Sequence, residues 1–433
     1  MKLQNDKNNY LYICTSCILS FTASPTVTEA IEQPISNKAN IILILADDLG
    51  ITGLNCYGGA FKTPNLDAMA KTGIRFENCF SAPLCAPSRA MIVTGKYNFR
   101  TKSSGNNARA VTPETETIIS KVLKNAGYTT AVSGKWSQLT LLSTVEEANA
   151  WGFDEFMIWD PTGERYWKPS LIHNGKKLET TEKDYGPDIL NDYVIDFVKR
   201  NKNRPFFVYY PLTLIHSPLA EIPEKKSGNG LLADNIAYMD KLVGKLLDSL
   251  DKLNLREKTL VIFTGDNGCG LGGTINGKKI NGDKGSLLEG GSRVPLIVNW
   301  KGSTPEGKVL KDFVELTDFY ATFADLAGIH FPNSITDSIS FAPQIKGEKG
   351  NPRQWVFIQL RDEWYIRNER WKLYNNGNFF DMKDAPFREI LVENLSNDAK
   401  NAKAELQSIL NNLITTDNIK NNNEKGNKRQ KKW

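Results

Sequence analysis

The sequence predicts an α/β fold, in which helices cover both faces of a large parallel sheet that is followed by a small antiparallel sheet with one helix. Two observations predict it. Continuous apolar runs rich in β-branched residues alternate with longer stretches whose apolar residues repeat at helical spacing, which is the pattern of strands that helices bury on both faces. From about Gly347 the apolar runs become short and polar turns separate them, which indicates antiparallel strands.

Four buried strands are expected in the larger, amino-terminal part of the chain. They are Asn40–Ala46, Phe206–Tyr210, Thr259–Thr264 and Leu296–Trp300. Ligands of such folds bind beyond the carboxyl ends of the strands. The polar pairs Asp47-Asp48 and Asp266-Asn267 each follow one of these strands, so we expect the two pairs to be neighbours in space although they are far apart in sequence.

Helices are expected between these strands and near the end of the chain. The expected helices are Asn65–Lys71, Glu116–Ala126, Asp188–Arg200, Asn235–Leu250 and Ala402–Ile414. The short carboxyl-terminal strands are expected at Val356–Leu360, Trp364–Arg367, Trp371–Tyr374 and Asn378–Asp381. In the last two helices the apolar residues form one face at helical spacing, which we expect to be buried. The sequence therefore predicts a large domain over residues 38–346 and a small subdomain over residues 347–416.

The two ends of the chain differ in composition from the rest. Lys2 and Lys7 precede an apolar run that reaches Phe21, and small residues follow, which is typical of a secretory signal peptide; a merely apolar start is the alternative. We expect residues 1–30 to be this signal and the protein to be exported, either periplasmic or secreted. Residues 417–433 are rich in Asn and Lys and are expected to form a disordered basic tail. No other run reaches the roughly 18 apolar residues of a membrane span.

The charge distribution excludes some classes of function. The formal net charge is +5, and residues 417–433 hold six basic and two acidic side chains, so the rest of the chain is close to neutral. Without a basic field, a nucleic-acid partner is not expected. The chain has only three histidines and none of them lies near the acidic pairs described above, which disfavours a zinc site.

The acidic pairs suggest a site for a different kind of cation. Asp47-Asp48 alone is also typical of a polar turn after a strand. Together with Asp266 and the amide oxygen of Asn267, however, these carboxylates form an all-oxygen set. Calcium takes about six to eight oxygen ligands at roughly 2.3–2.6 Å and tolerates flexible ligands better than magnesium does.

A second motif is Cys85-Ala86-Pro87-Ser88-Arg89. Pro87 favours the start of a helix, so Cys85 is expected at its amino end, where free amide groups attract anions. Arg89, one turn further on, can direct its guanidinium to the same place. A cysteine here is either a small buried residue or a nucleophile, and its surroundings suit a tetrahedral oxyanion.

This motif resembles the C-x-P-x-R signature of the formylglycine-dependent sulfatases, a family of the alkaline phosphatase superfamily in which a separate enzyme oxidises the cysteine to formylglycine. The similarity runs from about Asn40 to Leu413, and its elements come in the order that is typical of the family. They are Asp47-Asp48, Thr63–Asp67, Cys85–Arg89, Thr94-Gly95, Gly134-Lys135-Trp136, His216-Ser217-Pro218, Asp266-Asn267-Gly268, Lys284 and Glu289–Pro295. The resemblance implies an alkaline-phosphatase-like α/β sandwich, with a large mixed, mostly parallel sheet between helices.

The resemblance also implies a set of roles for residues of this chain. One calcium ion is expected, held by an oxygen of hydrated formylglycine at position 85 and by Asp47, Asp48, Asp266 and Asn267. Three cationic side chains are expected around the sulfate, namely Arg89, Lys135 and Lys284. A hydroxyl of the hydrated formylglycine is expected to attack sulfur, and His216 to give a proton to the leaving alcohol. His173 and His330 match nothing in the family pattern and are expected to be structural.

One position departs from the family pattern. Members commonly read Gly-Lys-Trp-His where this chain has Gly134-Lys135-Trp136-Ser137. The missing histidine is thought to help release sulfate from the covalent intermediate, a type of assistance that is worth about 10²–10⁴-fold in rate. Ser137, Gln138, Lys135 or water is expected to replace it.

The expected substrate is a sulfate ester on a carbohydrate or sulfated polysaccharide fragment, and the maturation enzyme is the expected partner. Aromatic residues are concentrated over Trp151–Trp167, and they form either a wall that stacks on a sugar ring or a packing cluster.

Two alternative functions remain open. One is a phosphonate or phosphate ester hydrolase of the same fold, against which Lys135 and Lys284 argue, and the other is a degenerate sulfatase that binds sulfated glycan without turnover, supported by Ser137.

Overall fold

The computed structural model describes residues 38–415, except for residues 107–109, 137–138, 225–227, 331–334 and 336. The expected signal peptide over residues 1–30 and the expected tail over residues 417–433 lie outside the described residues. No helix in this described part is long and apolar enough to cross a membrane.

A ten-stranded sheet forms the centre of the larger part, in the order β12-β2-β11-β8-β1-β7-β3-β4-β5-β6. β1 (Asn40–Ala46) pairs in parallel with β7 (Phe206–Pro211) on one side and with β8 (Thr259–Gly265) on the other, so three of the expected strands are adjacent. β11 (Arg293–Asn299) is antiparallel to β8 and to β2 (Ile74–Phe80). The predicted mixed, mostly parallel sheet is therefore confirmed. The remaining strands are β3 (Thr129–Gly134), β4 (Glu155–Trp159), β5 (Leu171–His173), β6 (Lys176–Lys177) and β12 (Lys308–Glu315).

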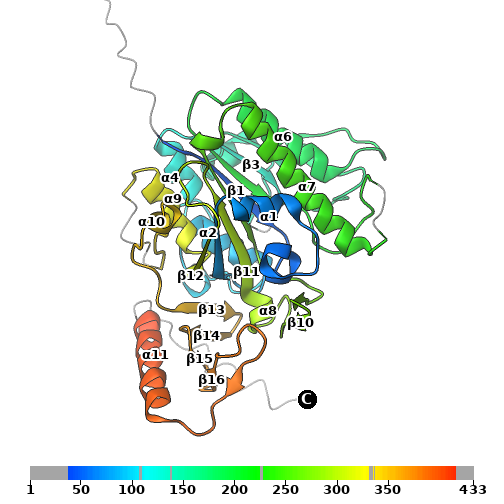
Figure 1. The fold of residues 1–433 in the computed structure, drawn as a ribbon. Helices are drawn as coiled ribbons and strands as arrows, with labels where there is room; N and C mark the ends of the chain where they lie inside the picture. The colour runs from blue at the N-terminus through cyan, green and yellow to red at the C-terminus, as the bar shows by residue number, and fades with distance from the viewer. Residues whose placement is uncertain are drawn as a thin grey trace, which may run out of the picture. The chain divides into compact units, whose positions relative to one another are not determined.

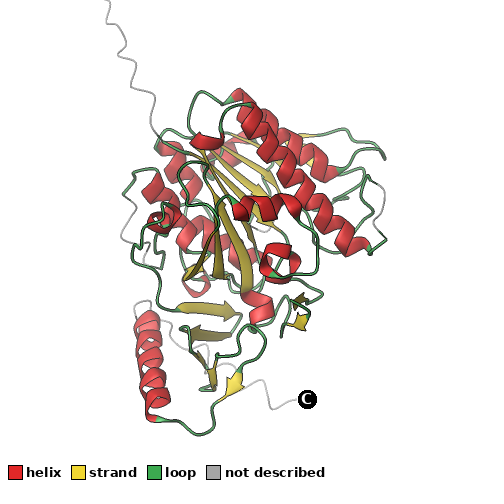
Figure 2. Cartoon of the chain, in the orientation of Figure 1, coloured by secondary structure: helices red, strands yellow, loops and turns green. Residues whose placement is uncertain are grey.

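Helices cover both faces of this sheet (Figures 1 and 2). One face carries α1 (Pro64–Lys71), α6 (Gly186–Arg200) and α7 (Leu231–Lys252), and the other carries α2 (Cys85–Thr94), α4 (Ile119–Asn125) and α9 (Asp318–Leu326). Side chains of β1 alternate between the two cores: Ile41, Leu43 and Leu45 enter the α2 side, and Ile42, Ile44 and Ala46 enter the α7 side. This double burial explains why the β1 sequence is apolar without interruption.

The expected helices are present, but some of their boundaries differ. The helix expected to begin at Glu116 begins at Ile119, because residues 112–116 form a turn in which the amide of Glu116 donates to the carbonyl of Thr112. α7 begins four residues earlier than Asn235, at Leu231. The shorter helices are α3 (Asn98–Thr101), α5 (Val145–Ala150), α8 (Glu289–Ser292) and α10 (Ala342–Ile345), and a two-stranded hairpin is formed by β9 (Thr274–Ile275) and β10 (Lys278–Lys279).

The small antiparallel sheet is also confirmed. Its order is β13-β14-β15-β16-β17, with every pairing antiparallel. The strands are β13 (Val356–Leu360), β14 (Glu363–Arg367), β15 (Trp371–Tyr374), β16 (Phe379–Asp381) and β17 (Ile390–Leu391), of which the sequence did not predict the last. α11 (Asn397–Thr415) packs Leu406 and Leu410 against Leu373 and Phe379 of this sheet.

A buried arginine joins the segment before β13 to the large sheet. Arg353 Nε donates to Asp318 Oδ2 at 3.0 Å, and its Nη1 lies 2.9 Å from Glu315 Oε2. All three side chains are almost fully buried. Glu315 ends β12 and also accepts from the amide of Phe357 in β13, so this ion cluster connects the two sheets.

Replacing this arginine should destabilise the fold strongly. Arg353→Met leaves two buried carboxylates without their cation, which costs about 3–5 kcal/mol when one partner of a buried pair is removed. Urea unfolding measures the change. Arg388→Met is the control, because Arg388 pairs with Asp384 at an exposed position and its loss should cost less than about 1 kcal/mol. Equal effects of the two substitutions would contradict this assignment.

Candidate active site

Strand pairing brings the acidic pairs together. Asp47 follows β1 and Asp266 follows β8, and these strands are in register at Ala46 and Gly265, so both carboxylates lie at the same edge of the sheet, as expected. The amide of Asp48 donates to Asp266 Oδ1 at 3.0 Å. Asp48 adopts a positive φ of 62°, which turns the chain sharply at the end of β1.

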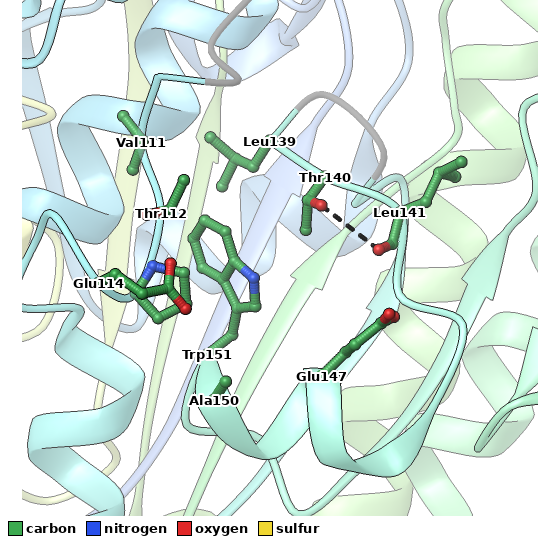
Figure 3. Close-up of a pocket in the computed structure, with 10 residues that line it drawn as sticks. Val111, Thr112, Glu114, Leu139, Thr140, Leu141, Glu147, Ala150 and Trp151 are labelled. Atoms are coloured by element: carbon green, nitrogen blue, oxygen red, sulfur yellow. Dashed lines mark hydrogen bonds between the residues drawn. The ribbon is translucent and has the colours of Figure 1, made fainter.

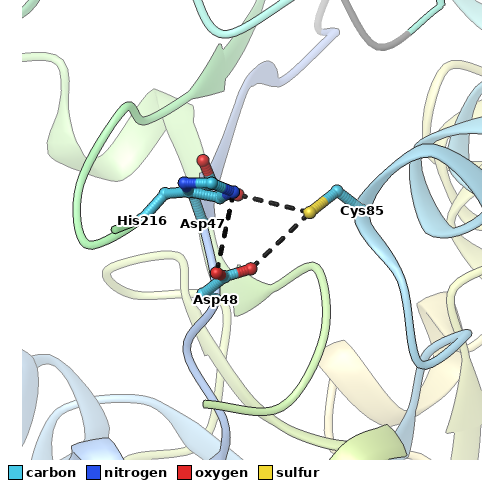
Figure 4. A group of neighbouring side chains, drawn as sticks. All are labelled: Asp47, Asp48, Cys85 and His216. Atoms are coloured by element: carbon cyan, nitrogen blue, oxygen red, sulfur yellow. Dashed lines mark hydrogen bonds and ion pairs between the residues drawn. The ribbon is translucent and has the colours of Figure 1, made fainter. Parts of the chain in front are cut away.

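Cys85 lies against both of these aspartates (Figure 4). It is the first residue of α2, and its Sγ is 3.6 Å from Asp47 Oδ1 and 3.5 Å from Asp48 Oδ1. His216, in the loop after β7, reaches the same place, with Nε2 at 3.8 Å from Asp48 Oδ2. Ligand atoms of these four side chains lie within 4.8 Å of one another.

Three cationic side chains neutralise the carboxylates. Lys135, which follows β3, places Nζ 2.8 Å from Asp47 Oδ1 and 3.8 Å from Cys85 Sγ. Arg89, one turn into α2, donates through Nε and Nη2 to Asp266 Oδ2 at 3.1 and 2.8 Å.

Lys284, in the loop before α8, donates to Asp48 Oδ1 at 2.6 Å. Each of the three aspartates therefore has a cation within hydrogen-bond distance, and Arg89 also lies 3.6 Å from Asp47. Every predicted site residue described so far belongs to one cluster.

The pKa values follow from burial and from these neighbours. Burial alone raises the pKa of the Asp47 carboxyl, but Lys135 and Arg89 outweigh it and hold that pKa below its ordinary value. Burial, Asp266 and Asp47 together raise the pKa of the Cys85 thiol well above its ordinary value. Burial lowers the pKa of His216 below its ordinary value, although Asp47 opposes this shift.

Asn267 completes a donor set that fits a hard cation. Its Nδ2 donates to Asp48 Oδ1 and to the carbonyl of Gly268, both at 2.9 Å. Its Oδ1 is buried and has no hydrogen-bond partner, which costs about 1–3 kcal/mol unless something binds it. A cation is a natural partner for this oxygen. The carboxylates of Asp47, Asp48 and Asp266 at the same edge of the sheet supply the kind of oxygen ligand that calcium prefers.

The remaining candidates lie elsewhere or are not described. Ser137 and Gln138, the expected substitutes for the family histidine, lie outside the described residues. Most aromatic side chains of Trp151–Trp167 are buried in the two cores, including Phe153, Phe156 and Trp159. Buried rings cannot stack on a sugar. Of the two interpretations of this stretch, a sugar-binding wall and a packing cluster, the packing cluster therefore applies to most of it.

A separate hollow lies near one of these aromatic residues (Figure 3). Its volume is about 310 Å³, and it lies between residues 111–114 and the segment of residues 139–151, with Trp151 among its lining side chains. None of the site residues described above lines it, so it is not part of the site.

Residues of the small sheet support the site without having been predicted. Lys372 on β15 is fully buried, and its Nζ donates to the carbonyl of Leu287 at 2.7 Å, three residues after Lys284. Arg367 on β14 donates to Glu289 Oε1 at 2.5 Å, at the start of α8. A lysine in a short strand gives no sequence signal of burial, so this support could not be foreseen.

Cysteine 85 should resist alkylation when it is left as a thiol. The thiolate is the reactive form, its pKa is raised here, and Cys85 is only 3% exposed. We expect iodoacetamide at mildly alkaline pH to leave Cys85 unlabelled in folded protein and to label it in urea. Peptide mass spectrometry measures both, and equal labelling in the two conditions would refute the described environment.

Known proteins resemble this chain over most of its length. The family model described as Sulfatase matches residues 39–329, and the model described as N-sulphoglucosamine sulphohydrolase, C-terminal, matches residues 278–416. The N-acetylgalactosamine-6-sulfatase of Canis lupus familiaris is 32% identical over 71% of this chain and 66% of its own length. The N-acetylgalactosamine-6-O-sulfatase of Bacteroides thetaiotaomicron is 28% identical over 81% of this chain and 84% of its own length.

Solved structures share the fold. The crystal structure of Ps i-CgsB in complex with k-i-k-neocarrahexaose matches with a TM-score of 0.74 and 29% identity, over 88% of this chain and 93% of that chain. The PsFucS1 sulfatase from Pseudoalteromonas sp. matches with a TM-score of 0.76 and 22% identity, over 88% of this chain and 90% of that chain.

Proposed function

Because the chain belongs to the sulfatase family, whose members hydrolyse sulfate esters, we propose that it removes sulfate from a carbohydrate with a formylglycine made from Cys85 and one calcium ion. The observation that carries the proposal is the position of Cys85 between two carboxylates, at 3.5 and 3.6 Å. The negative charge of these carboxylates disfavours ionisation of the Cys85 thiol, so the unmodified residue is a poor nucleophile at neutral pH. They also attract a cation, which a metal-dependent hydrolase needs.

The proposed metal ligands are position 85 and four side chains, Asp47, Asp48, Asp266 and Asn267. The unpartnered Oδ1 of Asn267 supports this set. When bound, calcium supplies a Lewis acid for a sulfate oxygen, and formylglycine supplies a hydroxyl nucleophile for sulfur.

The other side chains have electrostatic and proton-transfer roles in this proposal. Arg89, Lys135 and Lys284 stabilise the negative charge that develops on the sulfate oxygens, and one preorganised donor of this kind is worth on the order of 10²–10³ in rate. As the bond between sulfur and the alcohol oxygen breaks, the electron pair goes to that oxygen, and His216 supplies the proton that neutralises it.

Names of relatives support a carbohydrate substrate. Two of the relatives are named for sulfate esters of N-acetylgalactosamine, and Ps i-CgsB, at 29% identity, binds k-i-k-neocarrahexaose. We therefore propose a sulfated polysaccharide fragment as the substrate, a formylglycine-generating enzyme as the partner, and export directed by residues 1–30.

The decisive experiment follows position 85 in protein from its native host. Conversion of the thiol to an aldehyde lowers the mass of the peptide that contains Cys85, and we expect to find this loss by mass spectrometry. Cys85→Ala should then reduce release of sulfate from sulfated oligosaccharides by on the order of 10³-fold or more, because the nucleophile is gone.

Three other results would change the proposal. A thiol that stays unmodified in the host, with sulfate retained after long incubation, would favour a protein that binds sulfated glycan without turnover. Faster hydrolysis of a phosphate ester than of its matched sulfate ester would favour a phosphoesterase. Equal activity of Cys85→Ala and wild type would remove position 85 from the mechanism.

Calcium should stabilise the fold through this site. A ligand at 100 times its Kd raises the free energy of unfolding by about 2.7 kcal/mol, so calcium added after chelation should raise the Tm. Asp266→Asn should abolish most of this increase, and Asp362→Asn, at an exposed turn between β13 and β14, should retain it. Loss of the calcium effect in both variants, or in neither, would contradict the proposed ligands.

A further inference from the structure

We propose that Arg165 and Tyr166 are positioning residues that hold the backbone of His216 and so direct its imidazole to the leaving alcohol. The inference rests on the proposed function, because it takes His216 as the proton donor. Neither residue is a proposed ligand of the metal or the sulfate.

Two neighbouring side chains donate hydrogen bonds to the same carbonyl. Tyr166 Oη lies 2.8 Å from the carbonyl oxygen of His216, and Arg165 Nη1 donates to that oxygen at 3.2 Å. Tyr166 Oη is also 3.3 Å from the carbonyl of Thr213. A hydroxyl has one proton to donate, and the shorter distance assigns it to His216, whose carbonyl then uses both of its lone pairs.

The next residue extends this attachment. Trp167 Nε1 donates to the carbonyl of Glu221 at 2.7 Å. Three consecutive side chains therefore bind backbone carbonyls of the segment that carries His216 and follows β7. Backbone hydrogen bonds with Asp47 hold Leu214 and Ile215, just before His216. The side-chain bonds hold the carbonyl of His216 itself and the segment after it.

The fixed backbone determines which imidazole nitrogen faces the site. Nδ1 of His216 is hydrogen-bonded to the carbonyl of Ser217, and a carbonyl only accepts, so Nδ1 carries a hydrogen. Nε2 is then the nitrogen that exchanges the catalytic proton, and it lies 3.8 Å from Asp48 Oδ2. A change in the carbonyl position of His216 would move Nε2 relative to the alcohol.

The two donors are themselves held by aromatic packing. The guanidinium of Arg165 lies 4.4 Å from the ring centre of Trp159. The ring of Tyr166 is buried and lies 6.1 Å from that of Tyr185 in a stacked arrangement. The aromatic stretch thus acts at the site indirectly, by giving the positioning residues a rigid support.

A positioning role predicts a dependence on the leaving group. An alcohol of low acidity needs a proton as its bond to sulfur breaks, whereas an acidic phenol can leave as its anion. Loss of proton-donor alignment should therefore slow hydrolysis of phenyl sulfate more than hydrolysis of 4-nitrophenyl sulfate, because 4-nitrophenol is the more acidic leaving group. A general loss of structure would slow both equally.

The test uses the matured full-length enzyme with these two esters. We expect Tyr166→Phe to lower kcat for phenyl sulfate about 3- to 10-fold, the effect of one neutral hydrogen bond, with KM and the rate on 4-nitrophenyl sulfate unchanged. Arg165→Met should act in the same direction, and Arg165→Lys should restore part of the loss. His216→Ala should also slow phenyl sulfate more than 4-nitrophenyl sulfate, with a larger loss of kcat on phenyl sulfate, up to about 10²–10⁴-fold.

Tyr57→Phe is the matched control. The Tyr57 hydroxyl is also within hydrogen-bond distance of two backbone carbonyls, those of Phe76 at 2.8 Å and Leu296 at 3.0 Å, and its ring is buried. This variant should lower stability without changing the preference between the two esters. Equal slowing of both esters by Tyr166→Phe, as in the control, would overturn the positioning role.

A second measurement does not depend on turnover. Diethylpyrocarbonate modifies histidines, and mass spectrometry resolves His216 from His173, which serves as the internal reference. We expect Tyr166→Phe to raise the modification rate of His216 about 3- to 10-fold and to leave that of His173 unchanged. An unchanged rate at His216 would count against the inference.

The His216→Ala variant separates failure of the inference from failure of the proposed function. If His216→Ala lacked the preference for the acidic leaving group, the proton-donor assignment itself would fail, and the inference with it. If His216→Ala had the preference and Tyr166→Phe did not, only the inference would fail.

Discussion

Burial of three aspartates at the carboxyl ends of β1 and β8 is the constraint on which the rest of the site depends. Desolvating a carboxylate costs several kcal/mol unless a cation and hydrogen bonds compensate. Each compensating cation comes from a different element: Arg89 from α2, Lys135 from the end of β3 and Lys284 from the loop before α8. The charge balance therefore fixes the relative positions of three segments that are far apart in sequence.

The small carboxyl-terminal sheet belongs to the same electrostatic arrangement. Lys372 and Arg367 bind Leu287 and Glu289, which directly follow the loop that carries Lys284. Lys372 itself pairs with Glu389 and lies 3.8 Å from the ring centre of Tyr365. These bonds hold the segment that directly follows Lys284, so the small sheet supports the outer end of the cationic set.

Features that depend on local pattern were predictable from the sequence, and features that depend on tertiary partners were not. The uninterrupted apolar run of β1 indicates that helices cover both faces of this strand. The polar residues after β1 and β8 lie at the same edge of the sheet because these two strands are parallel. β2 escaped prediction because IRFENCF mixes polar and apolar residues. The burial of Lys372 and the hydrogen bonds of Tyr166 require partners from other segments, which no spacing within their own segment indicates.

The environment of Cys85 is unfavourable for thiol chemistry and consistent with metal-assisted chemistry. A nucleophilic cysteine needs neighbours that lower its pKa, yet two carboxylates lie within 3.6 Å and the pKa is raised. The same carboxylates, with the unpartnered oxygen of Asn267, favour a divalent cation. The uncharged hydroxyl of a hydrated formylglycine would avoid the repulsion that a thiolate meets from these carboxylates. The electrostatics therefore disfavour a thiolate at position 85, which is in agreement with the proposed formylglycine.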